Sequence, residues 1–283
     1  AVFVVDPSYA TAIAAGWNHY LLLRPDGSVE AEGDNSAGQC NVPAGLTANA
    51  IAGGWRHSLA LRPDGSVAAW GRDLEGQCNV PAGLTATAIA GARYASLALR
   101  PDGSVAQWGY LCAPYTASGP PAGLTATAID CGDNIAAALR PDGSVIAWGG
   151  VDVSNFGSGS VKSGLTDAIA ISCAPSFVAA LRSDGSIVMW DPDFSFEIPA
   201  TATAIAAGGH TLGHTLFAIL PDESVVFWEY SWNMNPEPTI IPGLKATAIS
   251  SKHAFLLAIG YIGKPPSRRR RAAWMNLERP LLF

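Results

Sequence analysis

Short apolar runs separated by turn residues recur along the chain, and within each run apolar positions alternate with small or polar ones. One copy reads AIAGG at 50–54, HSLALR at 57–62 and SVAAWG at 66–71, with Pro-Asp-Gly joining the last two. Such alternation is typical of strands with one buried face, and Asp-Gly is a hairpin signal. The pattern predicts three antiparallel strands per copy. A fourth, weaker strand fits at Cys-Asn-Val-Pro, before the Pro-Ala-Gly-Leu-Thr connection.

The copies repeat at a nearly fixed spacing. Successive Asp anchors of the hairpin are 38, 38, 40, 42 and 38 residues apart. A Trp follows the anchor by six residues in five copies, whereas the first copy has Glu32 there. A Trp at one fixed strand position in successive small sheets indicates core packing. The anchors are Asp26, Asp64, Asp102, Asp142, Asp184 and Asp222, and the tryptophans are Trp70, Trp108, Trp148, Trp190 and Trp228.

A repeat of this length, built from short strands, predicts an array of small sheets that bury their faces against one another. Six anchors and a seventh start at Ala248 indicate an all-β, seven-bladed β-propeller over residues 1–263. The seventh copy lacks its last strand-forming run, whereas the chain begins with the apolar segment Ala1–Val5. We therefore expect this N-terminal strand to close the last blade and to join the two ends of the ring.

The segments HSLALRPDGSVAAWG (57–71), GDNSAGQCNVPAG (33–45) and AIAGG resemble the repeat of the regulator of chromosome condensation superfamily. The resemblance covers roughly residues 1–263, and the short period is most similar to that of the bacterial β-lactamase inhibitory protein propellers. It implies a seven-bladed propeller that binds other proteins. The wedge of the nucleotide exchange factors has no counterpart in this sequence, so guanine-nucleotide exchange is not expected.

The turns of an antiparallel blade alternate between the two rims of the ring. The Asp-Gly hairpins and Pro-Ala-Gly-Leu-Thr connections share one rim, where uniformity serves the turns themselves. The Gly-Trp turns and loops such as GRDLEGQ (71–77) share the other, where residues vary. Trp, Tyr and Arg are enriched at interface hot spots, and the inhibitor-type propellers that the chain resembles bind through this rim. We therefore predict that the variable residues form a protein-binding face. The alternative is that these aromatic side chains only cover the ends of the blades. The predicted residues are Trp17, Asn18, Trp55, Arg56, Arg93, Tyr94, Asp133 and Asn134.

Little in the sequence indicates catalysis, because it contains no nucleophile elbow, phosphate-binding loop or zinc-protease motif. The five cysteines are odd in number and form no Cys-x-x-Cys pair, so we interpret them as small buried residues. His210 and His214 have a spacing that suits metal ligands on a helix, but their segment reads as a turn between strands. We expect no enzyme activity, no cofactor and no metal.

The last twenty residues depart from the repeat. They hold six of the 17 Lys and Arg and one of the 23 Asp and Glu, so their formal charge is +5 and that of the rest is −11. Pro265 and Pro266 should stiffen the exit from the last blade, and residues 269–277 could form a short helix. We interpret 264–283 as a basic C-terminal arm that docks on a partner chain or on the acidic propeller. The predicted anchors are Arg268, Arg269, Arg270, Arg271, Trp274, Leu277, Leu281 and Phe283.

Two functions fit this organisation. We favour a non-catalytic scaffold or peripheral subunit of a larger assembly, which binds one partner through the variable rim and another through the arm. The alternative is a free regulatory binder, either an enzyme inhibitor or a small-GTPase regulator, which uses the rim alone. The Arg run could also touch RNA or anionic lipid, although the acidic body argues against a broad nucleic-acid face.

The sequence bears only indirectly on localisation. No apolar run is long enough to span a membrane, so we expect a soluble protein. The chain opens on Ala1 without an initiator Met, which hints at a processed organellar or exported protein.

Overall fold

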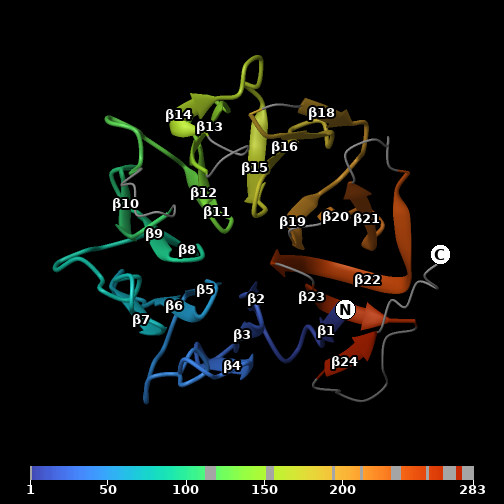
Figure 1. Ribbon diagram of the computed structural model, residues 1–283. Helices are drawn as coiled ribbons and strands as arrows, with labels where there is room; N and C mark the ends of the chain where they lie inside the picture. Colours follow the sequence, from blue (N-terminus) through green and yellow to red (C-terminus); the bar gives the residue numbers. More distant parts are fainter. Residues whose placement is uncertain are drawn as a thin grey trace.

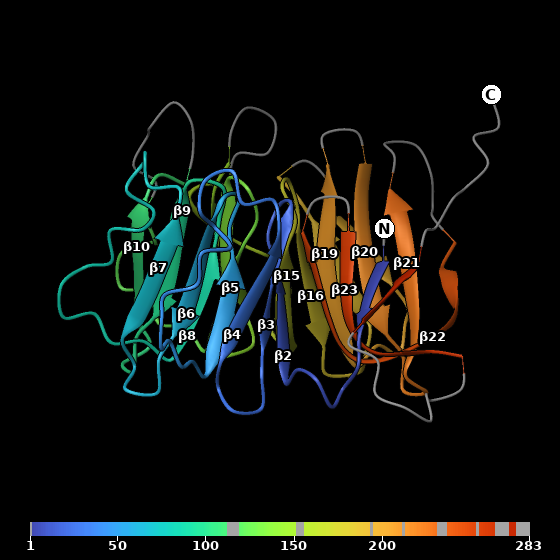
Figure 2. The same cartoon turned by 90° about the horizontal axis from the view of Figure 1, so that it is seen from below.

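A computed structural model describes residues 2–111, 119–150, 156–192, 195–210, 213–230, 237–252, 255–263 and 272–275. These residues form strands and turns, and the strands build six sheets around a central axis, the largest of which contains the last two of seven blades (Figure 1). Seen from the side, the strands run between two loop-bearing rims of a disc (Figure 2). The all-β, seven-bladed propeller is confirmed. None of the described residues forms a helix of the length and hydropathy that crossing a membrane requires.

The first three blades are three-stranded antiparallel sheets over the described residues, and the first strand of each lies nearest the axis (Figure 1). Their first strands, such as AIAG, combine one Ile with Ala or Gly residues and line the centre of the ring. The strands are β2 (Ala12–Ala15), β3 (His19–Leu23) and β4 (Val29–Gly33) in blade 1, β5 (Ala50–Gly53), β6 (His57–Leu61) and β7 (Val67–Gly71) in blade 2, and β8 (Ala88–Gly91), β9 (Ala95–Leu99) and β10 (Val105–Gly109) in blade 3.

The predicted fourth strand at Cys-Asn-Val-Pro is wrong for blades 1 and 2, where residues 40–43 and 78–81 form no strand. Side chains of the preceding loop form hydrogen bonds with backbone groups that a β-ladder would need. The Cys40 N–H donates to the Asn35 side chain (2.9 Å), and the Asn35 amide donates to the side chain of Asn41 (2.9 Å). Val42 still packs against the blade core.

The cysteines that the structure describes are free thiols, as the odd count and spacing predict. Cys131 and Cys173 are buried, in agreement with the interpretation as small core residues. Cys40 and Cys78 are only half-buried, and their thiols lie near the carbonyls of Asp34 (3.3 Å) and Arg72 (3.2 Å). Cys112 lies outside the described residues.

Blades 4 and 5 have the four strands that the repeat predicts. The Trp at the fixed repeat position is buried in blades 2 to 6, which confirms its structural role. The strands are β11 (Ala128–Cys131), β12 (Ile135–Leu139), β13 (Val145–Gly149) and β14 (Gly157–Val161) in blade 4, and β15 (Ala168–Cys173), β16 (Val178–Arg182), β17 (Ile187–Trp190) and β18 (Ser195–Ile198) in blade 5.

Blades 6 and 7 share one long strand, β22 (Thr239–Lys252), whose first half pairs with β21 (Ser224–Tyr230) and whose second half pairs with β23 (Phe255–Ile262). Blade 6 also contains β19 (Ala204–His210) and β20 (Gly213–Ile219), which are longer than the corresponding strands of the first four blades. His210 and His214 lie on these two antiparallel strands, with His214 opposite Gly209. The longer strands β19 and β20 thus extend the hairpin on which the two histidines lie.

The ends of the chain meet in blade 7. β1 (Val2–Val5) pairs in parallel with β23, with Val2 opposite Leu256, and antiparallel with β24 (Ala272–Met275). The N-terminal strand therefore closes the last blade, as expected. The short helix expected over 269–277 is wrong where the structure describes it, because residues 272–275 form a strand on the free edge of β1. Pairing with β1 satisfies backbone groups that an isolated short helix would leave open to water.

The closing strand contributes side chains to two cores. Val2 and Val4 pack into the cluster between blades 6 and 7, whereas Phe3 and Val5 pack into the cluster shared with blade 1. The Phe3 ring lies 4.7 Å from that of Tyr20, between centroids. Burial of these four side chains, each 5% exposed or less, stabilises the closed ring.

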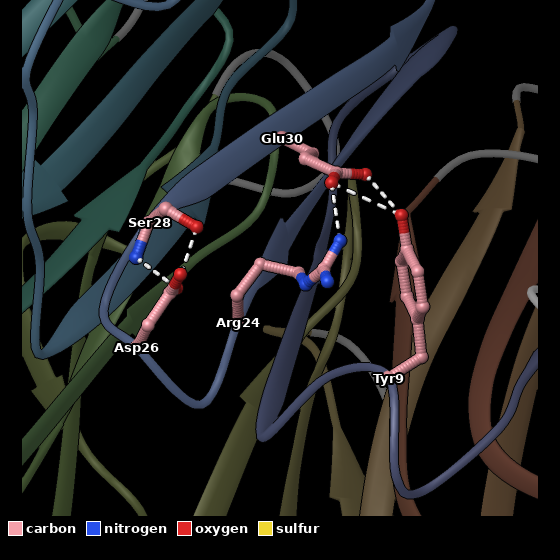
Figure 3. Close-up of polar contacts among 5 residues, drawn as sticks. All are labelled: Tyr9, Arg24, Asp26, Ser28 and Glu30. Carbon is pink, nitrogen blue, oxygen red and sulfur yellow. Dashed lines mark hydrogen bonds and ion pairs between the residues drawn. The ribbon is translucent and has the colours of Figure 1, made fainter.

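The hairpin rim, which carries the Asp-Gly turns, shows why its sequence is uniform (Figure 3). The Asp26 carboxylate accepts hydrogen bonds from the Ser28 N–H (2.9 Å) and hydroxyl (2.6 Å), and these bonds lower the pKa of Asp26. Gly27 has a φ of 82°, which glycine adopts without strain. Beside this turn, the Glu30 carboxylate accepts from Arg24 (2.6 Å) and from the Tyr9 hydroxyl (2.8 Å), which ties the first loop to blade 1.

Candidate protein-binding site

The predicted binding residues stand on two-residue turns between the first and second strands of each blade. The Gly16 N–H donates to the carbonyl of His19 (2.8 Å), and the Gly54 N–H donates to that of His57 (2.9 Å). A Cβ at Gly54 would lie 2.1 Å from Cε1 of His57, so only glycine lets the turn close over the imidazole. The Trp that follows each glycine is thereby held on the rim opposite the hairpin rim, which we call the variable rim.

Backbone hydrogen bonds link these turns from blade to blade. Each turn donates an N–H to a carbonyl of the next turn, so the turns of blades 1 to 4 form one continuous ribbon of backbone. A surface fixed in this way loses little conformational entropy on binding. The three bonds run from Trp17 to Gly54 (3.2 Å), from Trp55 to Ala92 (3.1 Å) and from Arg93 to Asp133 (3.1 Å).

Three aromatic side chains meet edge to face along this ribbon. The ring centroids of Trp17 and Trp55 are 6.2 Å apart with an interplanar angle of 83°. Those of Trp55 and Tyr94 are 5.3 Å apart at 89°. Each such contact contributes about 1 kcal/mol beyond burial. Side chains from three separate blades therefore form one half-buried surface.

Two of the predicted arginines lie over these rings. The guanidinium carbon of Arg93 is 5.0 Å from the centroids of both Trp55 and Tyr94, and 5.9 Å from that of Trp17. That of Arg56 is 4.8 Å from the centroid of Trp55. These distances fall in the range of cation–π attraction. The structure thus brings together five of the eight rim residues predicted from the sequence.

A sixth member, Arg72, was not predicted. Its guanidinium carbon lies 5.5 Å from the Trp55 centroid and 5.9 Å from the Tyr94 centroid, and it forms an ion pair with Glu75 (2.6 Å). Arg72 opens the loop after β7, whose position on the variable rim is visible in the sequence, so the loop residues next to the turns were the missing signal. The arginine–aromatic cluster comprises Trp17, Trp55, Arg56, Arg72, Arg93 and Tyr94.

Exposed apolar residues flank the cluster. Leu74 follows Arg72 in the same loop and is 81% exposed. Tyr110 is 39% exposed, and its N–H donates to the carbonyl of Tyr94 (2.8 Å). Leu74 and Tyr110 thus add exposed apolar surface on the loops that follow β7 and β10.

The remaining predicted residues fall in different places. Asn18 is exposed beside Trp17, and Asn134 is half-buried. Asp133 is buried, which raises the pKa of its carboxyl, while the positive charges of Lys252 and Arg93 act in the opposite direction. Trp274 lies in β24. The other arm residues, Arg268, Arg269, Arg270, Arg271, Leu277, Leu281 and Phe283, lie outside the described residues.

A buried network supports the cluster from below. Nε2 of His57 lies 3.0 Å from the Ser96 hydroxyl, which donates to the carbonyl of Gln77 (2.8 Å). The Trp108 indole N–H donates to the same carbonyl (2.8 Å). The corresponding interactions of His19 repeat this arrangement one blade earlier. Burial lowers the pKa of His57 to about 3 and that of His19 to about 4, so both imidazoles are neutral near pH 7.

The inner strands of all seven blades line a central cavity of about 200 Å³. Lys252, at the end of β22, crosses it and donates from Nζ to the carbonyls of Gly53 (2.9 Å) and Gly91. On the far side, the half-buried Asp130 carboxylate accepts the N–H groups of Cys131 (2.8 Å) and Cys173 (2.8 Å). These contacts tie blade 7 to blades 2 and 3, and blade 4 to blade 5, so the cavity's charged groups have structural roles.

Solved structures with the same fold are similar to this chain at low sequence identity. Human WBSCR16 is 17% identical, with a TM-score of 0.68 over 85% of this chain and 84% of that one. Prp20p from Saccharomyces cerevisiae is 16% identical, with a TM-score of 0.72 over 89% and 82%. The CRINKLY WD40 ectodomain of the Arabidopsis thaliana receptor kinase ACR4 is 18% identical, with a TM-score of 0.69 over 88% and 90%. At these identities the likeness concerns the fold.

The sequence itself matches one family model, described as the regulator of chromosome condensation (RCC1) repeat, over residues 49–77. No curated protein sequence matches the chain significantly. The matched segment contains β5, β6 and β7, which form the blade whose pattern recurs around the ring. The matched segment is therefore similar to the regulator of chromosome condensation repeat, and the other copies share its pattern around the seven-bladed ring.

Proposed function

We propose that the protein is a non-catalytic, protein-binding propeller that serves as a subunit of a larger assembly, and that it binds through the arginine–aromatic cluster. The observation that carries this proposal is the contact of Trp17, Trp55 and Tyr94 with three arginines on a ribbon of hydrogen-bonded turns. Clustered Trp, Tyr and Arg side chains on rigid backbone have the composition of an interface hot spot.

The similar structures support a protein partner. Prp20p of yeast was solved in a study of its binding to Gsp1p and histones, and yeast RCC1 (Prp20) was solved with Kap60 bound. Gsp1p, histones and Kap60 are partners of Prp20. A propeller with this fold can therefore bind other proteins, and we propose the same use for the variable rim of this chain.

The arm is proposed as a second attachment. Residues 272–275 already have a role within the chain, since β24 covers the free edge of β1. Their order therefore needs no partner, and the case for a second attachment rests on the basic run Arg268–Arg271 and on the residues beyond β24. The alternative of a free regulatory binder uses the same rim and differs in having no such attachment.

Truncation of Trp55 or Tyr94 to alanine is expected to weaken partner binding by about 2 kcal/mol or more, roughly thirtyfold in affinity. Trp55 is the central ring of the cluster, so its loss also removes the contacts of Trp17 and Arg93. The measurement is retention of copurifying proteins from native material, followed by quantitative mass spectrometry. The matched control is Thr85→Ala, an exposed position on the hairpin rim. Equal retention by all three variants would show that the cluster only covers the blade ends.

Two truncations are expected to separate the structural part of the arm from its attachment role. Ending the chain after Gly263 removes β24 and exposes the edge of β1, so a lower melting temperature and aggregation are expected. Ending it after Met275 should leave the melting temperature unchanged but lower recovery of the assembly. Replacement of Arg268–Arg271 by Ser in the full chain should also lower recovery of the assembly, and this decrease should be larger at low salt than at high salt. Full recovery by both the Met275 truncation and the Ser variant would favour the free binder.

A further inference from the structure

The three arginines of the arginine–aromatic cluster differ in whether a carboxylate binds their guanidinium group. Arg72 donates through Nε (3.0 Å) and Nη2 (2.6 Å) to the two carboxylate oxygens of Glu75. Arg56 and Arg93 have no carboxylate within ion-pair distance among the described residues. In Arg93, Nε is buried and has no hydrogen-bond partner in the part of the chain that the structure describes. An arginine in this state has donor capacity that a bound group can satisfy.

The contacts of Arg72 indicate which chemical group could bind Arg56 and Arg93. The guanidinium carbon of Arg72 lies over two rings while its in-plane N–H groups are held by a bidentate carboxylate. Ring faces and carboxylates therefore occupy different sides of the same cation and do not compete. Arg56 and Arg93 have the ring contacts but not the carboxylate.

We propose that the partner presents an acidic segment whose carboxylates bind Arg56 and Arg93 in the manner of Glu75, with a neighbouring apolar side chain against Leu74 and Tyr110. The inference rests on the proposed function and specifies the partner's chemistry. Leu74 is 81% exposed and follows Arg72 by two residues on the same loop, so its side chain is available to an apolar residue of such a segment.

The acidic groups of the same rim favour a peptide over a nucleic acid. The cluster is bordered by Asp34, Asp73 and Glu75, and the body without its arm has a formal charge of −11. A strand of nucleic acid needs a continuous cationic groove along its phosphates. Discrete carboxylates at two arginines avoid the acidic neighbours, whereas a phosphate backbone would meet them.

The test is an unbiased peptide-display selection against the full chain. Selected peptides are expected to contain at least two Asp or Glu next to an apolar or aromatic residue. Measured by fluorescence anisotropy, their binding should weaken about tenfold in Arg56→Gln and in Arg93→Gln, and with added salt. The matched controls are Arg62→Gln and Arg100→Gln, which make the same charge change at the hairpin rim. A melting temperature equal to that of the wild type shows that each variant keeps the fold.

Three outcomes would overturn the proposal. Neutral or basic peptides that lose binding in Trp55→Ala but not in Arg56→Gln would refute the acidic partner and leave the proposed binding function intact. Tighter binding of a labelled oligo-dT strand than of any selected peptide, lost in Trp55→Ala, would assign the cluster to single-stranded nucleic acid. Peptides whose binding is insensitive to Trp55→Ala would refute both proposals.

Discussion

Phe3→Ala is expected to destabilise the propeller by about 4 kcal/mol, and deletion of Val2–Val5 is expected to prevent a stable ring from forming. Phe3 is 5% exposed and contacts the Tyr20 ring in blade 1 from a strand that belongs to blade 7. Its removal leaves a cavity at the seam. Deletion goes further, because it takes away the partner of both β23 and β24 and exposes the apolar faces of two blades.

Thermal melting and light scattering measure this result. A loss of about 4 kcal/mol should lower the melting temperature by roughly 10 °C in a domain of this size. The matched control is Phe3→Leu, which keeps most of the volume and should cost no more than about 1.5 kcal/mol. If the deletion variant melted at the temperature of the full chain, the seam between blades 7 and 1 would not hold the ring closed.

The second large effect is a loss of stability in mild acid that depends on His57. Burial lowers the pKa of His57 to about 3 in the folded protein, whereas the ordinary value of 6.5 applies after unfolding. The unfolded chain therefore binds a proton first as the pH falls. The contribution of His57 to stability is complete above pH 6.5 and is lost progressively below it, by about 2 kcal/mol at pH 5.

His57→Gln should remove the part of this dependence that comes from His57, because the glutamine amide can still donate to Ser96 without titrating. Burial also lowers the pKa of His19, to about 4, and the contribution of His19 is present in both proteins. Urea unfolding at pH 8, 6.5 and 5 measures the free energy of unfolding of both proteins. The wild type should lose about 2 kcal/mol more than the variant between pH 8 and 5. Asp26 and Asp34 have lowered pKa values and titrate below this window. Parallel pH profiles of the two proteins would show that His57 is protonated or exposed in the folded state.

The ring and its closure could be predicted because they depend on patterns repeated along the chain. Asp-Gly hairpins, a Trp at a fixed position and an apolar N-terminal segment each report on local geometry, and the seventh copy lacks the strand that this segment replaces. The rim residues Trp17, Trp55 and Tyr94 could be predicted from the same register. Their mutual contacts follow from the stacking of blades, which the repeat already implies.

The features that were missed depend on particular side chains or on distant partners. Val42 fits a strand pattern, but the side chain of Asn35 captures the backbone of the loop that precedes it. The segment 272–275 has residues that are compatible with a helix, and only its pairing with β1 makes it a strand. Arg72 was missed because its loop can be placed on the variable rim from the sequence, whereas the contact of its guanidinium with the Trp55 ring of the neighbouring turn depends on the side-chain conformation.

The position of β1 between β23 and β24 also sets the order in which the molecule can be completed during synthesis. Val2–Val5 are synthesised before blades 1 to 6, yet both of their partner strands, β23 and β24, come after those blades in the chain. Blades 1 to 6 can therefore form while the first strand still exposes its apolar side chains. The final step joins residues more than 250 positions apart, so ring closure should be the slowest event in folding and the moment most sensitive to aggregation and to chaperones.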